Sequence, residues 1–413
     1  MAKNYASLYA SENDSIALEQ RFYLKEETTR GELKAPTGAD FFFTLAGGSI
    51  EYMQAIESSP HRSGRHHNNI IKKKKEANFS FSTYFNIDTT LGAPGVAEIE
   101  PAMRVLWKSL LGYEDTSSGL EYTAGIPNLT FSLYEVSDKW ARMMRGSFVQ
   151  SGNMSFPGDG EAKVDWAGNG KDALYVGLGK STADNNAANT ITLEAGEGAL
   201  FENAVGGLVM IIKDDGTTRS TDTPDGSPRT IVSVVGDVVT LSGAVLADAD
   251  GSGVGQPIYL SYYEPETPVG IDNPVTGLVG SFAVTGFSTI CARSVSVNVK
   301  NDHELVNNCY GKDSLSGAYF VPGSRLTAEV SFESNMNENL MKIFKSVEQF
   351  DGLDLTLVLG EAAGRRLEVT LPRVIFSIPS FAIPDTGSVP VTFSGTAYQT
   401  AFDAADEISV YFK

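Results

Sequence analysis

Several features that define familiar protein classes are scarce in this sequence. Only two of the 413 residues are cysteines, Cys291 and Cys309, so disulfide bonds cannot be the main source of stability, and no C-x-x-C metal or redox motif occurs. No apolar run approaches the roughly 18–20 residues of a membrane-spanning helix. The first twenty residues lack the apolar segment of a signal peptide. We therefore expect a protein that folds in the cytosol and has no contact with a membrane.

Positive charge is also scarce, and much of it is concentrated in one place. The chain has 32 Lys+Arg against 51 Asp+Glu, a formal net charge of -19. The segment 60–76 (PHRSGRHHNNIIKKKKE) contains one acid and six of the basic residues: Arg62, Arg65, Lys72, Lys73, Lys74 and Lys75. The rest of the chain keeps 26 basic and 50 acidic residues. Such an excess of acid disfavours general affinity for nucleic acid, which depends on many basic contacts to phosphate.

Helical patterns are few, and strand patterns dominate. The two best helical segments are 101–111, with proline at its first position and glycine after its last turn, and 338–347. Short runs that alternate apolar and polar residues are far more common, and Gly, Pro, Asn or Asp bound each of them. The clearest runs are 78–85, 129–134, 294–299, 326–332 and 355–359. The sequence therefore predicts a mainly β, mostly antiparallel fold.

An internal repeat divides the chain. Residues 129–168 align with 355–395 in order, spacing and pattern, although few residues are identical. The offset is 226 residues through most of the alignment and becomes 227 at its end, as these pairs show: Leu129 with Leu355, Phe148 with Val374, Asp159 with Asp385, and Gly168 with Gly395. A strand followed by a helix precedes the aligned segment in both halves. We interpret the repeat as one duplicated domain.

A segment of different character, 172–268, separates the two copies. Its apolar runs are short and alternate with Gly, Asp, Thr and Ser turns, which predicts a small all-β barrel or sandwich on the outer surface. A polar linker with several prolines follows at 264–276. We accordingly divide the chain into four parts: an N-terminal arm (1–45), the first copy (46–171), the inserted β-domain (172–268), and the linker with the second copy (269–413).

Two stretches are spelled like parts of catalytic or calcium sites. DTGS at 385–388 resembles the catalytic turn of an aspartic protease, but that chemistry needs a second such carboxylate, and the repeat offers only PGDG there. A hairpin turn is the simpler interpretation. DADGSG at 248–253 begins like a calcium loop, but Tyr259 stands where an EF-hand has its bidentate glutamate. A surface turn is again favoured.

Two further patterns fail for lack of partners. GLGKS at 177–181 lacks the first glycine of a phosphate-binding loop. The histidines His61, His66 and His67 have no cysteine or carboxylate at ligand spacing. Nothing in the sequence combines a nucleophile, a base and an orienting partner. We therefore predict that the protein is not an enzyme and has no metal or cofactor.

The order of elements is the same in both copies and forms a recognisable plan. In the first copy its parts are FYLKEETTRGELKAP at 22–36, a strand with a long polar loop at 50–76, the strand 78–85, the helix 101–111 and a closing pair of strands through 145–156. The second copy repeats the plan in 293–359 and 372–398. Over about three quarters of the chain this plan resembles the tail tube proteins of long-tailed bacteriophages.

The resemblance implies two tandem β-sandwich or barrel domains, each with one flanking helix, whose sheets join edge to edge with those of neighbouring subunits around a lumen. A chain with two copies would close as a trimeric, pseudo-sixfold ring. Stacked rings would form the tail tube of a virion, assembled in the host cytoplasm, through which DNA passes without specific binding. The other implied partners are the tail terminator and the baseplate or tip proteins.

In this resemblance the basic stretch belongs to a long loop, 54–76, that reaches the adjacent ring. A basic loop that meets an acidic surface would set the register of stacking. The corresponding loop of the second copy, 303–323, is nearly neutral. Two alternatives stay open: the basic residues contact DNA in the lumen, or they form a merely solvated loop.

Two other functions also stay open. One is a multi-domain β-sandwich adhesin or carbohydrate-binding protein. That class usually has a secretion signal and exposed aromatic platforms, whereas Trp107, Trp140 and Trp166 are scattered along the chain. The other is a tail terminator or hub component, which would differ from a tube subunit in copy number.

Overall fold

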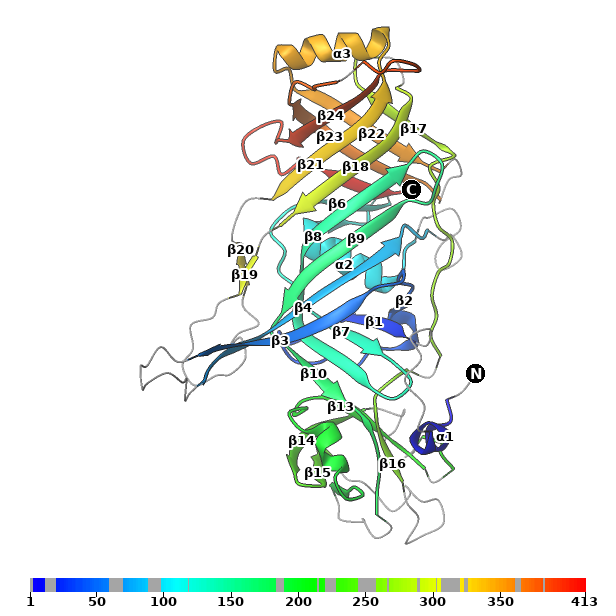
Figure 1. Cartoon of the computed structure of the whole chain (residues 1–413), viewed down its shortest axis with the longest axis vertical. Helices are drawn as coiled ribbons and strands as arrows, with labels where there is room; N and C mark the ends of the chain where they lie inside the picture. Colours follow the sequence, from blue (N-terminus) through cyan, green and yellow to red (C-terminus); the bar gives the residue numbers. More distant parts are fainter. Residues whose placement is uncertain are drawn as a thin grey trace.

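The fold is mainly β, as the sequence predicts. The computed structural model describes residues 3–11, 20–58, 70–87, 98–117, 119–182, 189–213, 215–219, 228–243, 258–265, 267–287, 290–301, 303–305, 320–322, 326–360, 365–381 and 383–413. Strands account for 51% and helices for 11% of the described residues. Figure 1 shows an elongated molecule, with the second copy at one end, the first copy in the middle and a separate small sheet at the other end.

The first copy is built from ten strands: β1 (Arg21–Glu26), β2 (Phe41–Phe42), β3 (Ser49–Ser58), β4 (Ile70–Tyr84), β5 (Gly112–Asp115), β6 (Leu120–Ala124), β7 (Phe131–Val136), β8 (Ala141–Pro157), β9 (Lys163–Gly170) and β10 (Asp172–Val176). Antiparallel pairing joins seven of them in the order β2–β1–β7–β8–β9–β4–β3, and β5 pairs with β6. The long strand β8 pairs with β7 and β10 through its first half and with β9 through its second.

The second copy has the same strand order. Its strands are β17 (Gly280–Val284), β18 (Ala292–Lys300), β21 (Thr327–Asn335), β22 (Leu353–Leu359), β23 (Leu367–Phe376), β24 (Pro390–Ala397) and β25 (Ser409–Phe412). They pair as β17–β22–β23–β24–β21–β18, with β25 on the first half of β23. Strand β8 and its counterpart β23 begin 226 residues apart, and β9 and β24 end 227 apart. The predicted offset therefore holds for these strands. It fails for β7 and β22, which begin 222 residues apart, so the predicted match of Leu129 with Leu355 is wrong; the loop between β22 and β23 is longer than the loop between β7 and β8.

One helix flanks each copy, at the positions that the sequence predicts. Helix α2 (Pro101–Leu111) starts at its proline and ends before Gly112. Gly112 has a φ of 98°, a conformation that glycine adopts more readily than other residues. Helix α3 (Glu338–Glu348) is capped by Asn337, whose side chain accepts a hydrogen bond from the Leu340 N–H at 2.9 Å. Helix α3 lies at the far end of the molecule in Figure 1.

The inserted segment forms a six-stranded sheet in the order β11–β16–β13–β14–β15–β12. Its elements are β11 (Leu178–Lys180), β12 (Thr190–Thr192), the 3-10 helix η3 (Glu197–Phe201), β13 (Leu208–Ile212), β14 (Arg229–Val235), β15 (Val238–Leu241) and β16 (Tyr259–Tyr262). Helix α1 (Tyr5–Ala10) packs on this sheet: the ring of Tyr9 meets that of Tyr259 in β16, with centroids 5.6 Å apart, and the Tyr5 N–H donates to the Gly216 carbonyl at 2.7 Å.

Three boundaries differ from the prediction. Residues 21–26 and 41–42, placed in an N-terminal arm, form β1 and β2 within the first sheet; the 3-10 helix η2 (Gly38–Asp40) lies between them. The first residues assigned to the insert, 172–176, are β10 and also belong to that sheet. The closing pair of strands expected through 145–156 is the single strand β8. In each case pairing with distant strands, which the local pattern does not encode, decides the boundary.

A single apolar core extends through both copies. In the first copy Trp107 of α2 is buried and meets Trp166 edge to face, with ring centroids 4.9 Å apart. Phe412, from the last strand of the second copy, lies 6.2 Å from the rings of both Trp107 and Tyr122. The two copies therefore share packing as well as strand pairing, and we expect them to be rigid relative to one another.

Candidate functional site: the basic hairpin and the sheet edges

The lysines of the basic stretch lie in a strand, so the predicted loop at 54–76 is wrong for the part that is described. Residues 54–58 belong to β3 and 70–76 to β4, and they pair in a hairpin in which Ile56 faces Lys72 and Gln54 faces Lys75. We call these two segments the basic hairpin. Arg62 and Arg65 lie outside the described residues.

The basic hairpin projects beyond the sheet as a two-stranded ribbon. Strand β9 pairs with β4 only from Ala77 onward, so residues 70–76 have β3 as their sole partner strand in the described structure. Figure 1 shows the ribbon leaving one side of the molecule. A two-stranded ribbon is marginally stable by itself. We therefore expect another surface to hold it in place.

Both charge and apolar surface are exposed on the basic hairpin. Lys72 is exposed, Lys73 forms an ion pair with Glu57, and the Lys75 ammonium lies 5.7 Å above the ring of Tyr52. Three isoleucines are also exposed, Ile56 by 60%, Ile70 by 60% and Ile71 by 46%. A merely solvated charge run would not need these isoleucines. The mixture is typical of a contact surface.

The equivalent loop of the second copy, expected at 303–323, also contains strands. Strands β19 (His303–Leu305) and β20 (Phe320–Pro322) form a small hairpin, which leaves the same side of the molecule as the basic hairpin in Figure 1. The ring of His303 is buried and packs on Phe148, with centroids 5.5 Å apart. This hairpin is thus anchored on the first copy.

The two copies join edge to edge. Strand β18 of the second copy runs antiparallel along the second half of β8, from Ser294 opposite Pro157 to Lys300 opposite Ser151. Just beyond this pairing the Asn301 N–H donates to the Gln150 carbonyl at 2.8 Å. A second pairing joins β25 to β6. We call the β18–β8 contact the internal junction, and through it two equivalent sheets become one continuous sheet (Figure 1).

The matching edge of the first copy, on β3, has no strand partner among the described residues, and side chains cover it instead. The Ile50 N–H donates to Glu135 Oε2 at 3.1 Å, and the Ile50 carbonyl accepts a hydrogen bond from Arg142. Gln20 donates to the Gly48 carbonyl at 3.2 Å and to Glu135 Oε1 at 2.7 Å. We call Gln20, Glu135 and Arg142 the edge clasp.

The edge clasp is buried and charged. Glu135 is 1% exposed, and its carboxylate lies 3.1 Å from the Arg142 guanidinium. Burial raises the pKa of Glu135, and the charge of Arg142 together with hydrogen bonds from Ile50 and Gln20 opposes that rise. Sequence reasoning missed these residues. The available signal was two opposite charges facing one another across the β7–β8 hairpin.

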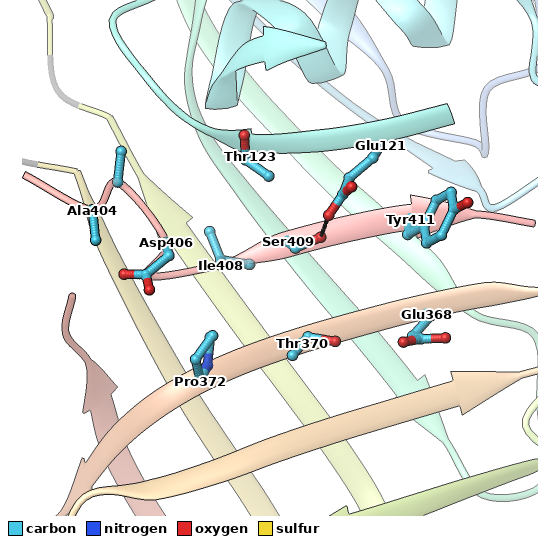
Figure 2. A pocket seen from close by; sticks show the side chains of 11 residues that line it. Glu121, Thr123, Glu368, Thr370, Pro372, Ala404, Asp406, Ile408, Ser409 and Tyr411 are labelled. Carbon is cyan, nitrogen blue, oxygen red and sulfur yellow. Dashed lines mark hydrogen bonds between the residues drawn. The ribbon is translucent and has the colours of Figure 1, made fainter. Parts of the chain in front are cut away.

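A hollow of about 390 Å³ lies where β6, β25 and β23 meet (Figure 2). Its polar groups are engaged within the chain: the Ser409 hydroxyl donates to Glu121 at 2.5 Å, and Glu368 accepts from Lys413 at 2.8 Å. No histidine or cysteine lines it. The lining offers carboxylates and hydroxyls, and it lies where the second pairing joins the two copies.

The described residues give the discarded motifs structural roles or leave them unplaced. The turn at 385–388 is exposed, and the Ser388 hydroxyl donates to Asn335 at 2.9 Å. Residues 178–180 of the glycine-containing motif form strand β11. The structure does not describe the three histidines considered as metal ligands, residues 248–253 or Cys309. Cys291 is free and exposed. Within the described part of the chain, no group of three or more His, Cys, Asp or Glu side chains could hold a metal ion.

Comparison with known proteins gives no identification. No family model matches the chain, and no curated protein does. Among the helices of the described residues, none is both long and apolar enough to span a bilayer. The class defined by the structure is therefore that of a mainly antiparallel β protein with two like-ordered sheets joined at their edges.

Proposed function

We propose that this protein is a structural subunit that assembles with copies of itself into rings, and that stacked rings form a hollow tube. The single observation that carries the proposal is the internal junction, where an edge strand of one copy pairs along seven residues of the other. Edge strands are normally blunted because they invite association. Here the chain already contains one such association between its two equivalent sheets.

Repetition of the junction would generate a ring. An interface that joins unlike surfaces head to tail either closes into a ring or continues as a filament. The first copy retains the equivalent of the edge that β18 uses, and the second copy retains the equivalent of the β8 segment. Three chains would then supply six sheets around a lumen, as in the tail tube proteins that the sequence resembles.

The remaining features support a conduit more than a catalyst. The chain is strongly acidic overall, with a formal net charge of -19, and a lumen wall of that sign would repel DNA and let it slide. The hollow where β6, β25 and β23 meet has no histidine or cysteine in its lining. We accordingly place the protein in the tail of a virion, with the tail terminator, the baseplate or tip proteins and passing DNA as its other partners.

The basic hairpin is the proposed contact between rings. It leaves the body of the molecule as a ribbon and exposes isoleucines beside lysines. An acidic surface on the next ring would attract the lysines, and the isoleucines would lose their exposed area on contact. Stacking should then weaken as salt screens the charges, since the Debye length falls from about 10 Å at 0.1 M to about 3 Å at 1 M.

Negative-stain electron microscopy of the purified protein, over a series of protein and salt concentrations, tests the proposal. Hollow tubes with a regular ring repeat are the expected result. A protein that stays monomeric at every concentration, also with pre-formed tube fragments present as seeds, would contradict it. Glycan binding by such monomers would favour the adhesin function instead.

A matched pair of variants tests the hairpin. Replacing Lys72 and Lys73 with glutamate should leave rings intact and shorten or abolish tubes, because both side chains would repel an acidic neighbour. The control replaces Lys342 and Lys345 with glutamate, the same change in charge on the exposed face of α3. Tubes of equal length from both variants would show that the hairpin does not direct stacking.

A further inference from the structure

We infer that the outer edge of β3 in one chain pairs antiparallel with residues 377–381 of a second copy of the chain, in the register of the internal junction, and that the edge clasp opens when it does. This inference rests on the proposed function and specifies the surfaces that would close the ring. Three features of the structure support it: the equivalence of β3 and β18, the state of 377–381, and the position of the clasp.

Ile50 in β3 occupies the place that Val297 has in β18. Ile50 and Gly168 lie opposite the same residue of β4, on its two sides. In the same way, Val297 and Gly395 lie opposite the same residue of β21. Gly168 and Gly395 are equivalent in the repeat, so the two edge residues are equivalent as well. Val297 pairs with Met154 across the internal junction.

The backbone groups of the two edges point the same way. In β18 the Arg293 carbonyl accepts from the Gly158 N–H at 2.9 Å, and the Asn301 N–H also bonds to the β8 side. Because every second residue of a strand directs its N–H and C=O to the same neighbour, Val297 directs its groups to β8 as well. In β3 the groups of Ile50 also point outward, but they meet Glu135 and Arg142.

The partner segment follows from the pairing of β8 and β23. Gly168 pairs with Val149 and Gly395 with Phe376, an offset of 227, and the bulge between Val149 and Ser151 reduces it to 226 from Ser151 onward. The β8 residues 151–157 correspond to 377–383, of which 377–381 and 383 are described. Strand β23 ends at Phe376, and Pro379 has no N–H to offer to β24, so the sheet cannot continue there. Within the described structure, residues 378–381 form no backbone hydrogen bond. Ile378 is 53% and Phe381 41% exposed.

The register places Met53 opposite Ser377, Tyr52 opposite Ile378, and Ile50 opposite Ser380. The proline suits this arrangement, because in the equivalent β8 position the N–H points away from the partner edge. Ile378 would turn to the inner face, where its counterpart Gly152 is buried between strands. An exposed isoleucine and an unpaired backbone would both be covered by the contact.

The edge clasp is a guard on this surface. Its side chains form hydrogen bonds with the same N–H and C=O of Ile50 that pairing with Ser380 would need. In the unassembled chain, these backbone groups are therefore not available to another strand. Pairing must exchange these side-chain bonds for backbone bonds. The second copy has no such clasp on Val297, because β8 is already there.

Disulfide cross-linking tests the register. In a background with Cys291→Ser and Cys309→Ser, Met53→Cys is combined with Ser377→Cys, because these residues would form a non-hydrogen-bonded pair with close Cα atoms. The control combines Met53→Cys with Phe381→Cys, four residues out of register. Each variant is oxidised at high protein concentration and run on a non-reducing gel.

We expect covalent dimers and higher multimers at least tenfold more abundant for the in-register pair than for the control. Equal yields, or no cross-link in either variant, would overturn the inference. Tubes in the microscope without the in-register cross-link would leave the proposed function standing, whereas absence of both would refute both.

Variants of the clasp test its guarding role. Replacing Glu135 and Arg142 together with glutamine removes both charges, so neither is left buried alone. We expect in-register cross-linking to become several-fold faster. Arg142→Lys keeps the charge but not the planar fork, and it should accelerate cross-linking less. An unchanged rate in both variants would show that the clasp does not guard the edge.

Discussion

Replacing Glu100 with glutamine should stabilise the protein at alkaline pH and change little in acid. Glu100 immediately precedes helix α2, is 2% exposed, and accepts a hydrogen bond from the Ile271 N–H at 2.7 Å. Burial raises the pKa of this carboxyl from 4.5 to about 7; the Ile271 hydrogen bond opposes the rise and the charge of Asp272 adds to it. Glutamine retains an acceptor oxygen for Ile271 without the charge.

The size of the effect follows from linkage. The folded protein holds the Glu100 proton more tightly than the unfolded chain, so the stability associated with the protonated carboxyl is present below about pH 4.5 and lost as the pH rises through about 7. At 1.36 kcal/mol for each pKa unit, the loss is about 3 kcal/mol. The variant should therefore exceed the natural protein by less than about 1 kcal/mol at pH 5 and by about 3 kcal/mol at pH 8.

Urea unfolding followed by tryptophan fluorescence measures this difference. All three tryptophans lie in the first copy, where α2 is packed, so their emission reports on the relevant part of the molecule. Glu32→Gln, at an exposed position, controls for the removal of one negative charge. A difference that does not grow between pH 5 and pH 8, or a Glu100→Gln variant less stable at pH 8, would refute the reasoning.

The remaining predictions concern packing and capping, and thermal unfolding measures both. Gly168→Ala would place a Cβ 2.1 Å from the Phe148 carbonyl oxygen and should destabilise the protein by at least about 2 kcal/mol; Gly125→Ala, where the nearest atom is at 3.4 Å, is the control. Equal melting temperatures for the two variants would contradict the close approach. Asn337→Ala should remove the cap of α3 and cost about 1 kcal/mol, whereas Asn337→Asp should retain it. An alanine variant as stable as the aspartate variant would show that the cap contributes nothing.

Local signals were enough to predict helices α2 and α3 and the strands with the clearest alternation, in β4, β7, β18, β21 and β22; they did not predict α1. Pro101 and Gly112 mark the ends of α2, and these signals act within a single turn. The repeat was also visible, because β8 and β9 have nearly the same spacing as β23 and β24 even where residues differ. Both kinds of signal depend on neighbours in the chain, so they survive in a single sequence.

The basic hairpin shows where local reasoning failed. Four consecutive lysines have low strand propensity and predict a solvated loop. Pairing with β3 overrides that propensity, since Ile56 and Gln54 lie opposite Lys72 and Lys75 in an antiparallel ladder whose register shifts between the two pairs. The partner strand, which the run of lysines does not contain, decides the conformation.

The internal junction and the edge clasp could not be found in this way. The junction joins residues about 140 positions apart, Ser294 and Pro157 at one end of it. The clasp joins three segments that are distant in the sequence: Gln20 just before β1 and Ile50 in β3 both donate hydrogen bonds to Glu135 in β7. No periodicity connects such distant segments, because their contact depends on the twist and order of the whole sheet.

Strand content, helix positions, the acidic surface and the duplication follow from the order of residues alone, because each arises from side-chain type and spacing within a short segment. Which edges are paired, which are guarded and which are left open was decided only in the folded molecule. Backbone groups are the same in every residue, so their partners depend on which strands the tertiary fold brings side by side.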